Sequence, residues 1–530
     1  MAPARPSAPR PELSSWGWGD PELVPALPET VRTLLEEGLG VRGGLDRPGA
    51  VELPPPRLGR DVFADVVEPV HVSDDDGARL RHLRGKSTPD LLRLRLGDVS
   101  GAPDLVLEPG SHEQVLDLLR VCSERRIAVV PFGGGTSVVG GLEPEADAFA
   151  GVVAVDLRRM NALLELDEES RRAVLEPGLR GPEAQALLAE RGYTLGHFPQ
   201  SFEYATVGGF AATRSSGQAS AGYGRFDELV LSVRLATPAG TLEAGRAPKS
   251  AAGPDLRQLV LGSEGALGVI TAVAVQVRPA PERRVYNGWR LPSFSAGIEV
   301  LRRLAQDGPL PAVVRLSDET ETAVGLARPS ALGAGGSGCL AIVGYEGSVV
   351  SVELCRTGVG RALEAAGAVP VPGAGDAWAE DRYRGPYLRD AMLDAGALVE
   401  TLETVAFWSA VPRVYEWVSA ALRDSLSAQG TPPVILCHVS HVYPAGASLY
   451  FTVGCAQAED PVAQWQVAKA AASDAILAAG ASITHHHGVG TDHRAWYERE
   501  IGPLGVAVLR AVKAQLDPAG IMNPGVLVPR

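Results

Sequence analysis

The feature that most constrains this chain is a glycine-rich turn directly after a strongly apolar segment. Val129–Phe132 runs into Gly133-Gly134-Gly135, and Thr136 and Ser137 follow. Glycine has no Cβ, so the backbone N–H groups of such a turn can approach a ligand closely, and the two hydroxyls add donors. The turn therefore predicts a phosphate cradle for a dinucleotide, with an ordinary surface loop as the alternative. It does not read as Gly-x-Gly-x-x-Gly opening a helix, so a nicotinamide-binding Rossmann site fits poorly.

The composition narrows the class of protein. A chain of 530 residues is too long to fold around a single hydrophobic core, so roughly two to four domains are expected. The net charge of −14, with acidic and basic residues interspersed, argues against a nucleic-acid surface, so any positive site for an anion is local. The five cysteines are scattered without a Cys-x-x-Cys pair, so neither a disulfide framework nor a zinc site of that kind is indicated.

Turn signals and apolar periodicity divide the chain into parts. Residues 1–97 read as a disordered-looking arm, Met1–Pro11, followed by a short amphipathic helix near Pro28–Gly38, and the whole looks like an appendage. From Asp104 the pattern becomes regular, with a strand, a Pro-Gly turn, a helix capped by Ser111, and the strand that delivers the glycine turn. A similar strand and helix at 173–191 look like a second half of the same α/β domain.

Two further clusters of small residues follow the first. One runs from Gly196 to Gly217 and is dense in glycine, serine and threonine, with few charges. The other is Gly262–Ile270, which leads into a strand ending near Pro279. Segments of this kind suit a backbone wrapped around a flat polar ligand. Three separated clusters in one domain are poorly explained as ordinary loops.

In order and spacing, these three clusters resemble the FAD-binding domain of flavoproteins of the vanillyl-alcohol-oxidase type. The resemblance implies FAD and an α+β fold, with a two-subdomain FAD-binding domain and an α+β cap domain for the substrate. Covalent relatives carry a histidine where this chain has Thr136, so non-covalent FAD is expected. The implied cofactor-binding residues are Pro131, Phe132, Gly133, Gly134, Gly135, Thr136, Ser137, Gln200, Ser201, Thr206, Gly208, Gly209, Thr213, Arg214, Ser215, Ser216, Glu264, Gly265, Leu267, Gly268, Val269, Ile270 and Asn523.

The expected domains are four. They are an N-terminal arm and helical appendage at 1–97, the FAD-binding domain at 98–280, the cap domain at 281–470, and a C-terminal segment at 471–530 that completes the active site. The cap is expected to alternate strands, such as 312–316 and 340–345, with helices, such as 296–306 and 411–428.

Two arginines of the cap stand out. Arg315 lies in an apolar strand, where an unpaired guanidinium would be costly, so it needs an anion. An ion pair with Asp318 or another carboxylate is one interpretation. A substrate phosphate, whose oxygens suit the planar guanidinium fork, is the other. The second arginine is Arg389, which precedes Asp390.

Three consecutive histidines, His485, His486 and His487, lie near the C-terminus. Neighbouring side chains of an extended chain point in opposite directions, so the three cannot all face one ion and no metal site is expected. Histidine titrates near neutrality, so a pair on one face with a tyrosine hydroxyl would form a proton-transfer group. Tyr450, in a hairpin expected at 437–453, is the candidate tyrosine, and a core aromatic is its alternative reading.

The histidine run with Gly488-Val489-Gly490, Tyr450 upstream and Trp16-Gly17-Trp18-Gly19 near the start are similar to the alkylglycerone-phosphate synthase family. The similarity spans about Trp16 to Pro529. That family exchanges the acyl group of acyl-dihydroxyacetone phosphate for a fatty alcohol in ether-lipid synthesis. It does so without net redox change, and flavin N5 holds the dihydroxyacetone phosphate carbon.

Matching motif positions carry the family's residue roles to this chain. The resemblance implies Tyr450 as the acid/base, His485, His486 and His487 as support for proton transfer, and Arg389 as a substrate-binding residue. It also implies that activity depends on Arg315, and it places Thr401 in the substrate site, where the family can carry serine. Tyr450 can act as a base only if a neighbouring cation or hydrogen bond lowers its pKa, which the histidines are expected to do.

Two other functions are open alternatives. The first is an FAD-dependent dehydrogenase of 2-hydroxy acids, although Leu436–Tyr443 lacks the His-x-x-Gly-Asp-Gly-Asn metal segment common in that group. The second is a catalytically silent flavin-binding protein, which would lose the arginines and acid/base residues that are present here.

The resemblance implies a lipid-like phosphate and a fatty alcohol as small-molecule partners, no nucleic acid, and a homodimer. The Ala/Gly/Pro/Arg-rich composition suggests a bacterial member. No apolar run has membrane-spanning length, so a cytoplasmic protein is expected, with peripheral membrane contact left open.

Overall fold

The computed structural model describes residues 3–7, 10–23, 26–44, 51–325 and 336–529. Its first layer is a four-stranded sheet of order β1-β2-β4-β3, in which β2, β4 and β3 are parallel and β1 is antiparallel. The strands are β1 (Val72–Ser73), β2 (Leu105–Leu107), β3 (Ile127–Phe132) and β4 (Gly151–Asp156), and helix α4 (His112–Arg125) connects β2 to β3. The glycine turn leaves the carboxyl end of β3, where ligands of parallel sheets commonly bind.

A second, antiparallel sheet of order β5-β6-β10-β8-β9 lies beside the first. The predicted repeat of strand and helix therefore belongs to two different sheets, because β6 pairs antiparallel with β10 whereas β2 pairs parallel with β4. Its elements are β5 (Leu163–Asp167), β6 (Arg172–Leu175), α5 (Gly181–Ala189), α6 (Val207–Ala212), α7 (Ser220–Tyr223), α8 (Phe226–Leu229), β8 (Val230–Thr237), β9 (Gly240–Ala244), α9 (Arg257–Val260) and β10 (Val269–Gln276), and β7 (Tyr193–Thr194) pairs separately with β11 (Arg278–Pro279).

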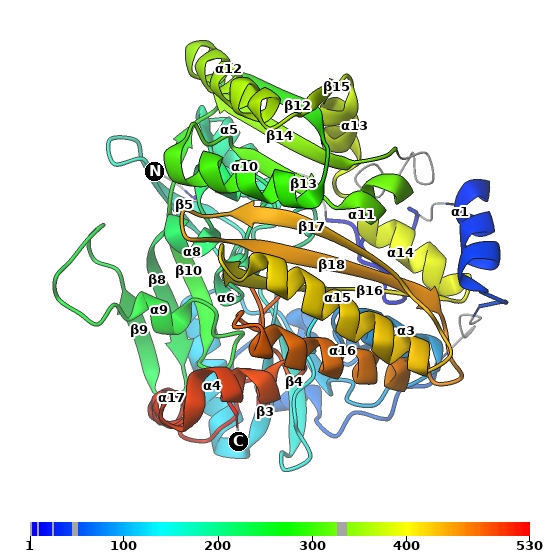
Figure 1. The fold of residues 1–530 in the computed structure, drawn as a ribbon. Helices are drawn as coiled ribbons and strands as arrows, with labels where there is room; N and C mark the ends of the chain where they lie inside the picture. Colours follow the sequence, from blue (N-terminus) through cyan, green and yellow to red (C-terminus); the bar gives the residue numbers. More distant parts are fainter. Residues whose placement is uncertain (1–2, 8–9, 24–25, 45–50, 326–335, 530) are drawn as a thin grey trace.

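The cap is a seven-stranded antiparallel sheet of order β15-β12-β14-β13-β17-β18-β16. Helices α10, α12 and α15 cover one face of it (Figure 1). The elements are β12 (Arg283–Leu291), α10 (Phe294–Asp307), β13 (Val313–Ser317), α11 (Glu319–Val324), β14 (Cys339–Gly347), α12 (Val349–Ala365), β15 (Val369–Val371), α13 (Ala374–Asp381), α14 (Gly385–Asp394), β16 (Ala397–Phe407), α15 (Val411–Ala428), β17 (Val434–Val442) and β18 (Gly446–Ala456).

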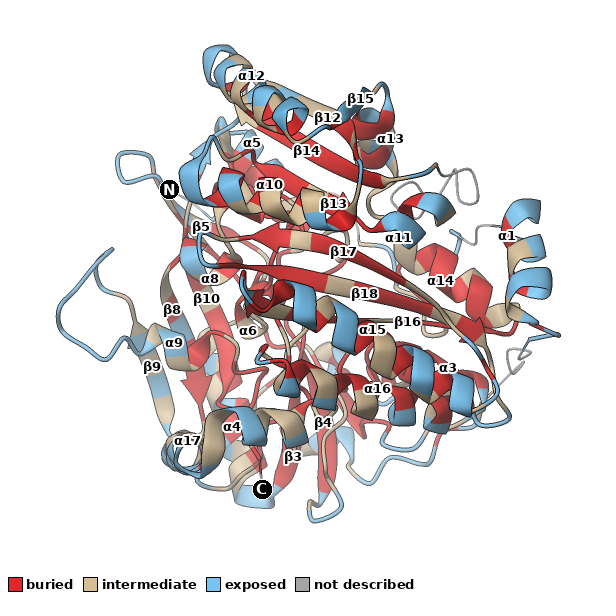
Figure 2. Ribbon diagram, viewed as in Figure 1, coloured by how far each residue is buried: buried red, intermediate tan, exposed pale blue. Residues whose placement is uncertain are grey.

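Strand alternation gives the cap sheet two chemically different faces. Leu398, Leu402, Leu449, Phe451 and Val453 point toward the helices and belong to the largest hydrophobic core. Their neighbours in sequence point to the opposite face, where Val399, Thr401, Tyr450, Thr452 and Gly454 line a cavity. Figure 2 shows the buried residues concentrated in the strands and on the inner sides of the helices.

The N-terminal region is more than an appendage. Phe63, Val67 and Val72 join the core of the first sheet, because β1 pairs with β2 and brings the preceding turns onto it. The described part of the arm is also packed: Ala4 bridges Leu163, and Arg10 binds Glu183. The remaining helices here are α1 (Glu29–Thr33), η1 (Leu34–Gly38), η2 (Arg60–Phe63), η3 (Pro69–His71), α2 (Asp76–Arg81) and α3 (Thr88–Arg95), and Met1, Ala2, Ala8 and Pro9 of the predicted arm lie outside the described residues.

The C-terminal part returns the chain to the FAD-binding sheets. Helix α16 (Pro461–Ala478) crosses the boundary predicted at residue 470, because it packs on α15 as a continuous part of the cap. Helix α17 (Arg494–Leu516) follows the histidine segment and contains a kink at Gly502. Met522 then forms a parallel bridge with Val129, so the end of the chain lies against the strand that leads into the glycine turn. Among the described helices, none has the length and apolarity needed to cross a bilayer.

Candidate functional site

A cavity of about 450 Å³ lies between the inner face of the cap sheet and the glycine-rich loops. The turn Gly133–Ser137 forms part of its wall, and the backbone N–H groups of these residues make no hydrogen bond to other described residues. Such groups are costly to leave unpaired, so the turn is built to receive an external acceptor. A dinucleotide pyrophosphate supplies acceptors of this kind, and the cradle therefore fits FAD.

Most of the cofactor residues expected from the sequence line this cavity. Nineteen of the twenty-three are there: Pro131, Phe132, Gly133, Gly134, Gly135, Thr136, Ser137, Gln200, Ser201, Thr206, Gly208, Gly209, Thr213, Ser215, Ser216, Glu264, Gly265, Gly268 and Ile270. The other four act behind the wall. Leu267 and Val269 are packed in hydrophobic cores, Arg214 donates to the backbone carbonyls of Leu261 and Gln258, and Asn523 donates to those of Gly141 and Glu264.

Glu264 holds two distant loops together. Its carboxylate accepts hydrogen bonds from the backbone N–H groups of Val489 and Gly490, at 2.7 and 2.8 Å. Burial raises the pKa of this carboxyl to about 7, and the two hydrogen bonds oppose that shift. The third glycine cluster is thus fastened to the segment that follows the histidines.

The floor of the cavity is a set of cross-strand rows on the cap sheet. In one row Tyr450 pairs with Glu403 on one side and with His438 on the other. The next row contains Thr401, Thr452 and Leu436, and the third contains Val399, Gly454 and Val434. Because successive rows lie about 7 Å apart along a strand, the floor changes from ionisable side chains to apolar ones along its length.

Tyr450 lies at the polar end of this floor. Its ring stacks on that of His438, with centroids 4.9 Å apart, and the rings of His486 and His487 lie at 6.2 and 5.5 Å. Burial raises the pKa of its hydroxyl to about 12, opposed by a hydrogen bond with Thr401 and by Arg389. The histidines are therefore not the cause of a lowered pKa of Tyr450 that the sequence suggested, because those beside Tyr450 are buried and neutral rather than cationic.

One buried carboxylate organises the histidine segment. Glu403 accepts hydrogen bonds from the Thr484 hydroxyl at 2.7 Å and from the backbone N–H groups of His485, His486 and His487 at 2.7, 3.1 and 3.0 Å. Burial alone would raise the pKa of Glu403, but the three imidazoles hold it well below its ordinary value. Burial in turn lowers the pKa of His486 to about 3. His486 and His487 line the cavity, and His485 lies behind them.

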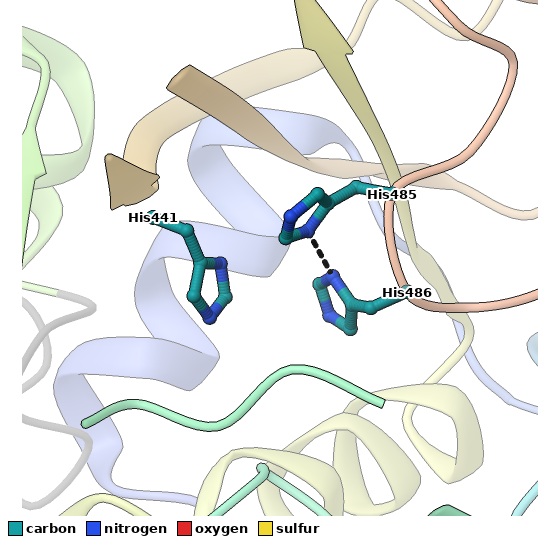
Figure 3. Close-up of side chains that lie close together, drawn as sticks. All are labelled: His441, His485 and His486. Atoms are coloured by element: carbon teal, nitrogen blue, oxygen red, sulfur yellow. Dashed lines mark hydrogen bonds between the residues drawn. The ribbon is translucent and has the colours of Figure 1, made fainter. Parts of the chain in front are cut away.

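Residues 484–487 wrap around the carboxylate of Glu403 and do not form an extended strand. The side chains of consecutive histidines therefore do not point in opposite directions, as they would in a strand. The Nδ1 atoms of His485 and His486 lie 2.9 Å from each other. His441 of β17 faces this pair, with its ring 4.9 Å from that of His485 (Figure 3). A β-bulge at Ser440 places His441 on the cavity face, since the register shifts between Val439 and His441.

Arg315 forms an ion pair with a carboxylate, as one of its two predicted interpretations required. Its guanidinium contacts Glu321, not Asp318, and the same group lies 2.9 Å from Nε2 of His438. Glu321 also binds Nδ1 of His438 at 2.9 Å. Asp318 instead caps helix α11 by accepting from the N–H of Glu321. Arg315 also lines the cavity, so the same guanidinium forms an ion pair with Glu321 and remains next to the space where a substrate would bind.

Arg389 is held by the N-terminal arm. Its guanidinium binds Asp390 at 2.9 Å and donates to the carbonyl of Lys86 at 2.6 Å. The second oxygen of Asp390 accepts from the backbone N–H of Trp18, whose side chain lines the cavity. The Trp16–Gly19 motif is therefore a strap that fixes a cavity arginine.

A third arginine of the cavity wall was not expected from the sequence. Arg382 lies over the rings of Tyr383, Phe198 and Trp378, at 4.9, 5.4 and 5.8 Å, and its buried Nε and Nη1 have no hydrogen-bond partner among the described residues. Nothing local marks this arginine in the sequence. Glu403, in contrast, could have been found, because strand alternation places it on the same face as Thr401.

Comparisons with known proteins agree with this architecture. Residues 103–245 match the model of an FAD binding domain, and residues 280–527 match that of the C-terminal domain of FAD linked oxidases. A solved structure of p-cresol methylhydroxylase shares the fold, with a TM-score of 0.68 over 89% of this chain and 96% of that chain at 16% identity. The protein is thus an FAD-binding enzyme of the FAD-linked oxidase class.

More similar relatives define the family within that class. Alkyldihydroxyacetonephosphate synthase of Dictyostelium discoideum is 35% identical over 87% of this chain and 79% of its own length. The Trypanosoma brucei brucei enzyme of the same name is 32% identical over 92% of this chain and 84% of its own. A solved alkyldihydroxyacetonephosphate synthase superposes with a TM-score of 0.81 at 30% identity, covering 97% of this chain and 98% of that chain. The chain belongs to the alkyldihydroxyacetonephosphate synthase family.

Proposed function

We propose that this protein exchanges the acyl group of an acyl-dihydroxyacetone phosphate for a fatty alcohol, forming an alkyl-dihydroxyacetone phosphate in ether-lipid synthesis. The observation that carries the proposal is the graded cavity floor, with Tyr450 and His438 at one end, beside the buried carboxylate of Glu403, and Val399, Gly454 and Val434 at the other. A substrate with a charged, reactive head and a long apolar chain matches this gradient. Bound FAD supplies the electrophilic ring for the exchange, held non-covalently because Thr136 occupies the position of an attaching histidine.

The apolar end of the cavity suits a hydrocarbon chain. Val31, Leu34, Leu35 and Leu39 of the N-terminal helices line it together with Val324, Met392 and Val399. A Cβ built on Gly454 would lie 3.9 Å from Leu39 Cδ1, so this glycine leaves the floor open beneath the helix. Each methylene buried there is worth roughly 0.8 kcal/mol, and a long chain therefore gains far more than a short hydroxy acid.

The arginines are proposed to bind the phosphate. Arg389 and Arg315 each have a carboxylate partner, although Nε of Arg315 makes no hydrogen bond to the described residues. Both Nε and Nη1 of Arg382 are buried without a hydrogen-bond partner in the part of the chain that the structure describes. A phosphate would satisfy these donors, and its charge would be held against a guanidinium that is already oriented by three aromatic rings. Thr401 is proposed to orient the substrate beside Tyr450.

Tyr450 is proposed as the acid/base at the carbon next to the ketone. With a pKa raised to about 12, its hydroxyl is protonated and is first a hydrogen-bond donor to substrate oxygen. To accept a proton, it must pass its own to a neighbouring group. The neutral imidazoles of His486 and His487 are the bases beside it, so they are proposed to support that transfer.

An anaerobic exchange assay tests the function. Purified FAD-loaded protein is mixed with palmitoyl-dihydroxyacetone phosphate and radiolabelled hexadecanol, without an electron acceptor. Release of palmitate and label in a phosphate-bearing ether product are expected. Flavin reduction by a 2-hydroxy acid, with no exchange, would replace the proposal by the dehydrogenase alternative.

We further propose that the protein acts in the cytoplasm as a homodimer in peripheral contact with membranes that hold its substrates. Exposed Val349, Val350 and Leu354 on helix α12 support the contact, since such side chains insert into an interface at little cost. Light scattering of the purified protein and flotation with phosphatidylcholine vesicles test the two points. A monomer, or protein that stays at the bottom of the gradient, would contradict them.

A further inference from the structure

His441, His485 and His486 form a cluster that the proposed reaction does not fully explain. One ring nitrogen from each lies within 4.8 Å of the others. The residues come from two places, the bulged end of β17 and the wrapped histidine segment, and their rings surround a common space in Figure 3. We infer that this cluster is a binding site for a divalent transition-metal ion of the zinc type. The inference reverses the expectation drawn from the three histidines in sequence.

The distances are close to those that such an ion requires. Zinc binds imidazole nitrogen at about 2.0–2.1 Å, so two ligands in a tetrahedral site lie roughly 3.4 Å apart. The Nδ1 atoms of His485 and His486 are 2.9 Å apart, and one ring nitrogen from each of the three histidines lies within 4.8 Å of the others. Side-chain rotations that move atoms by about 1 Å bring all three to the required spacing.

Hydrogen bonds behind the rings select the correct tautomers. Nε2 of His441 lies 3.0 Å from the carbonyl oxygen of Gly217, and a carbonyl only accepts, so this nitrogen carries the proton and Nδ1 is left with its lone pair. Nε2 of His485 lies 2.6 Å from the Tyr443 hydroxyl, which can accept its proton in the same way. Metal-binding histidines are usually oriented by such partners on the far nitrogen.

Two local changes accompany binding. The ion takes the place of the proton between His485 and His486, and that proton moves to Nε2 of His486 without a change in net charge. It also displaces the hydroxyls of Ser440 and Ser448, which lie 3.0 and 3.2 Å from Nδ1 of His441. These two hydroxyls already contact each other at 2.6 Å, so neither is left without a partner.

The charges around the cluster favour a cation on balance. The carboxylate of Glu403 is fully buried and lies 3.6 Å from Nδ1 of His486. The nearby cation Arg225 is paired with Asp227 at 3.1 Å. Three neutral nitrogens with one position open toward the cavity match the ligand set of zinc, whereas magnesium and calcium prefer oxygen ligands.

The consequence for activity rests on the proposed function. An ion on these nitrogens removes the bases proposed to support Tyr450, so zinc is expected to inhibit the exchange reversibly and a chelator to restore it. Binding itself needs no substrate. If the protein retains zinc but shows no exchange activity even after a chelator has removed the zinc, the site stands and the proposed function alone is refuted.

Equilibrium dialysis of the FAD-loaded protein against zinc, followed by elemental analysis, tests the site directly. One zinc per chain is expected, with affinity at least about 10-fold weaker in His441→Gln and in His486→Gln. His112→Gln, a histidine bonded to Thr241 and Thr271 outside the cluster, is the matched control and should retain zinc fully.

Crystals of the wild-type protein soaked in zinc make the test independent of variant folding. An anomalous peak among the three rings is expected at the zinc absorption edge. No retention in dialysis, retention unaffected by both substitutions in protein with normal flavin absorbance, or a peak elsewhere would overturn the inference.

Discussion

At the scale of single residues, the chemistry of the cavity depends on which buried ionisable side chains are charged and on which partners they have. Glu403 stays charged because the three imidazoles beside it, together with the four hydrogen bonds it accepts, hold its pKa well below the ordinary value, whereas burial lowers the pKa of His486. Arg315 and Arg389 each have a carboxylate beside them, and Arg382 has only aromatic faces around part of its guanidinium. The three arginines therefore differ in their partners, and for this reason the phosphate contact is proposed for Arg382.

Tyr450→Phe removes one hydroxyl from the polar end of the floor. Turnover in the exchange assay should fall by about 100- to 10,000-fold, the usual range for a general acid/base, while FAD content stays normal. Tyr345→Phe is the matched control, because its hydroxyl is buried in the cap core away from the cavity. Unchanged turnover in Tyr450→Phe would refute the assigned role.

Arg382→Gln should weaken binding of the phosphate head. A lost charge-assisted hydrogen bond costs about 1.5–3 kcal/mol, so KM for acyl-dihydroxyacetone phosphate should rise at least about 10-fold. KM for the fatty alcohol should be little changed, because that substrate carries no phosphate. Arg303→Gln, on the exposed side of α10, serves as the control. Equal KM increases for both substrates would count against a phosphate contact.

Glu264 should make stability depend on pH. Its pKa is about 7 in the folded protein and near 4.5 when unfolded, so the folded state binds the proton more tightly. The resulting stabilisation is complete below about pH 4.5 and is lost as pH rises to 7, by up to about 3 kcal/mol. Glu264→Gln lacks this change. Between pH 5 and pH 7.5, the melting temperature of the wild type should therefore fall relative to that of Glu264→Gln. Parallel curves of melting temperature against pH would contradict the prediction.

At the scale of elements, the helices and strands with regular apolar periodicity could be predicted from the sequence. The segments with irregular backbone could not. Helix α4, the strand into the glycine turn and the hairpin β17–β18 follow apolar spacing and turn signals. The bulge at Ser440 and the wrapping of residues 484–487 around Glu403 depend on long-range hydrogen bonds. Their effect on His441 and on the direction of consecutive histidines therefore could not be deduced from spacing.

Strand β18 sets the depth of the apolar end through Gly454. Gly454→Leu should fill the space below Leu39 and raise KM for long-chain acyl substrates at least about 10-fold, with short-chain acyl substrates much less affected. Gly454→Ala is the control, because its Cβ meets Leu39 only at an ordinary contact distance of 3.9 Å. KM is measured against acyl-chain length for the wild type and the two variants. A dependence that Gly454→Leu leaves unchanged would refute the proposal that the hydrocarbon chain of the substrate lies beside Gly454.

At the scale of the whole molecule, the cavity is built from nearly every part of the chain. Trp18, Thr136, Ser216, Arg382 and His487 all line it, although the sequence separates them widely. The identity of the cofactor could be predicted because three glycine clusters carry it. The contribution of the N-terminal arm could not, since Trp18 binds Asp390 through a backbone N–H that any residue possesses.

Because the residues expected to bind FAD come from several of these parts, FAD binding should stabilise the whole fold. At 100 times Kd, the gain is about 2.7 kcal/mol, measurable as a rise in melting temperature of the apoprotein. Gly134→Val should abolish the gain, because a Cβ there would clash with the backbone of Tyr204. Gly97→Asn is the control, because Gly97 lies at an open surface position and asparagine tolerates its left-handed φ; this variant should respond to FAD as wild type does. A normal response of Gly134→Val would place FAD elsewhere.

The bulge at Ser440 also shows how a protein of this kind can acquire new chemistry at low cost. One additional residue in a strand reverses the direction of the side chains on one side of it and leaves the other side in register. Val439 and Leu449 keep their places in the core, while His441 lines the cavity and the Ser448 hydroxyl contacts its ring. Inserting or deleting a single codon at this point would exchange the reactive lining of the cavity without a new fold, so length variation here is a direct route to altered specificity.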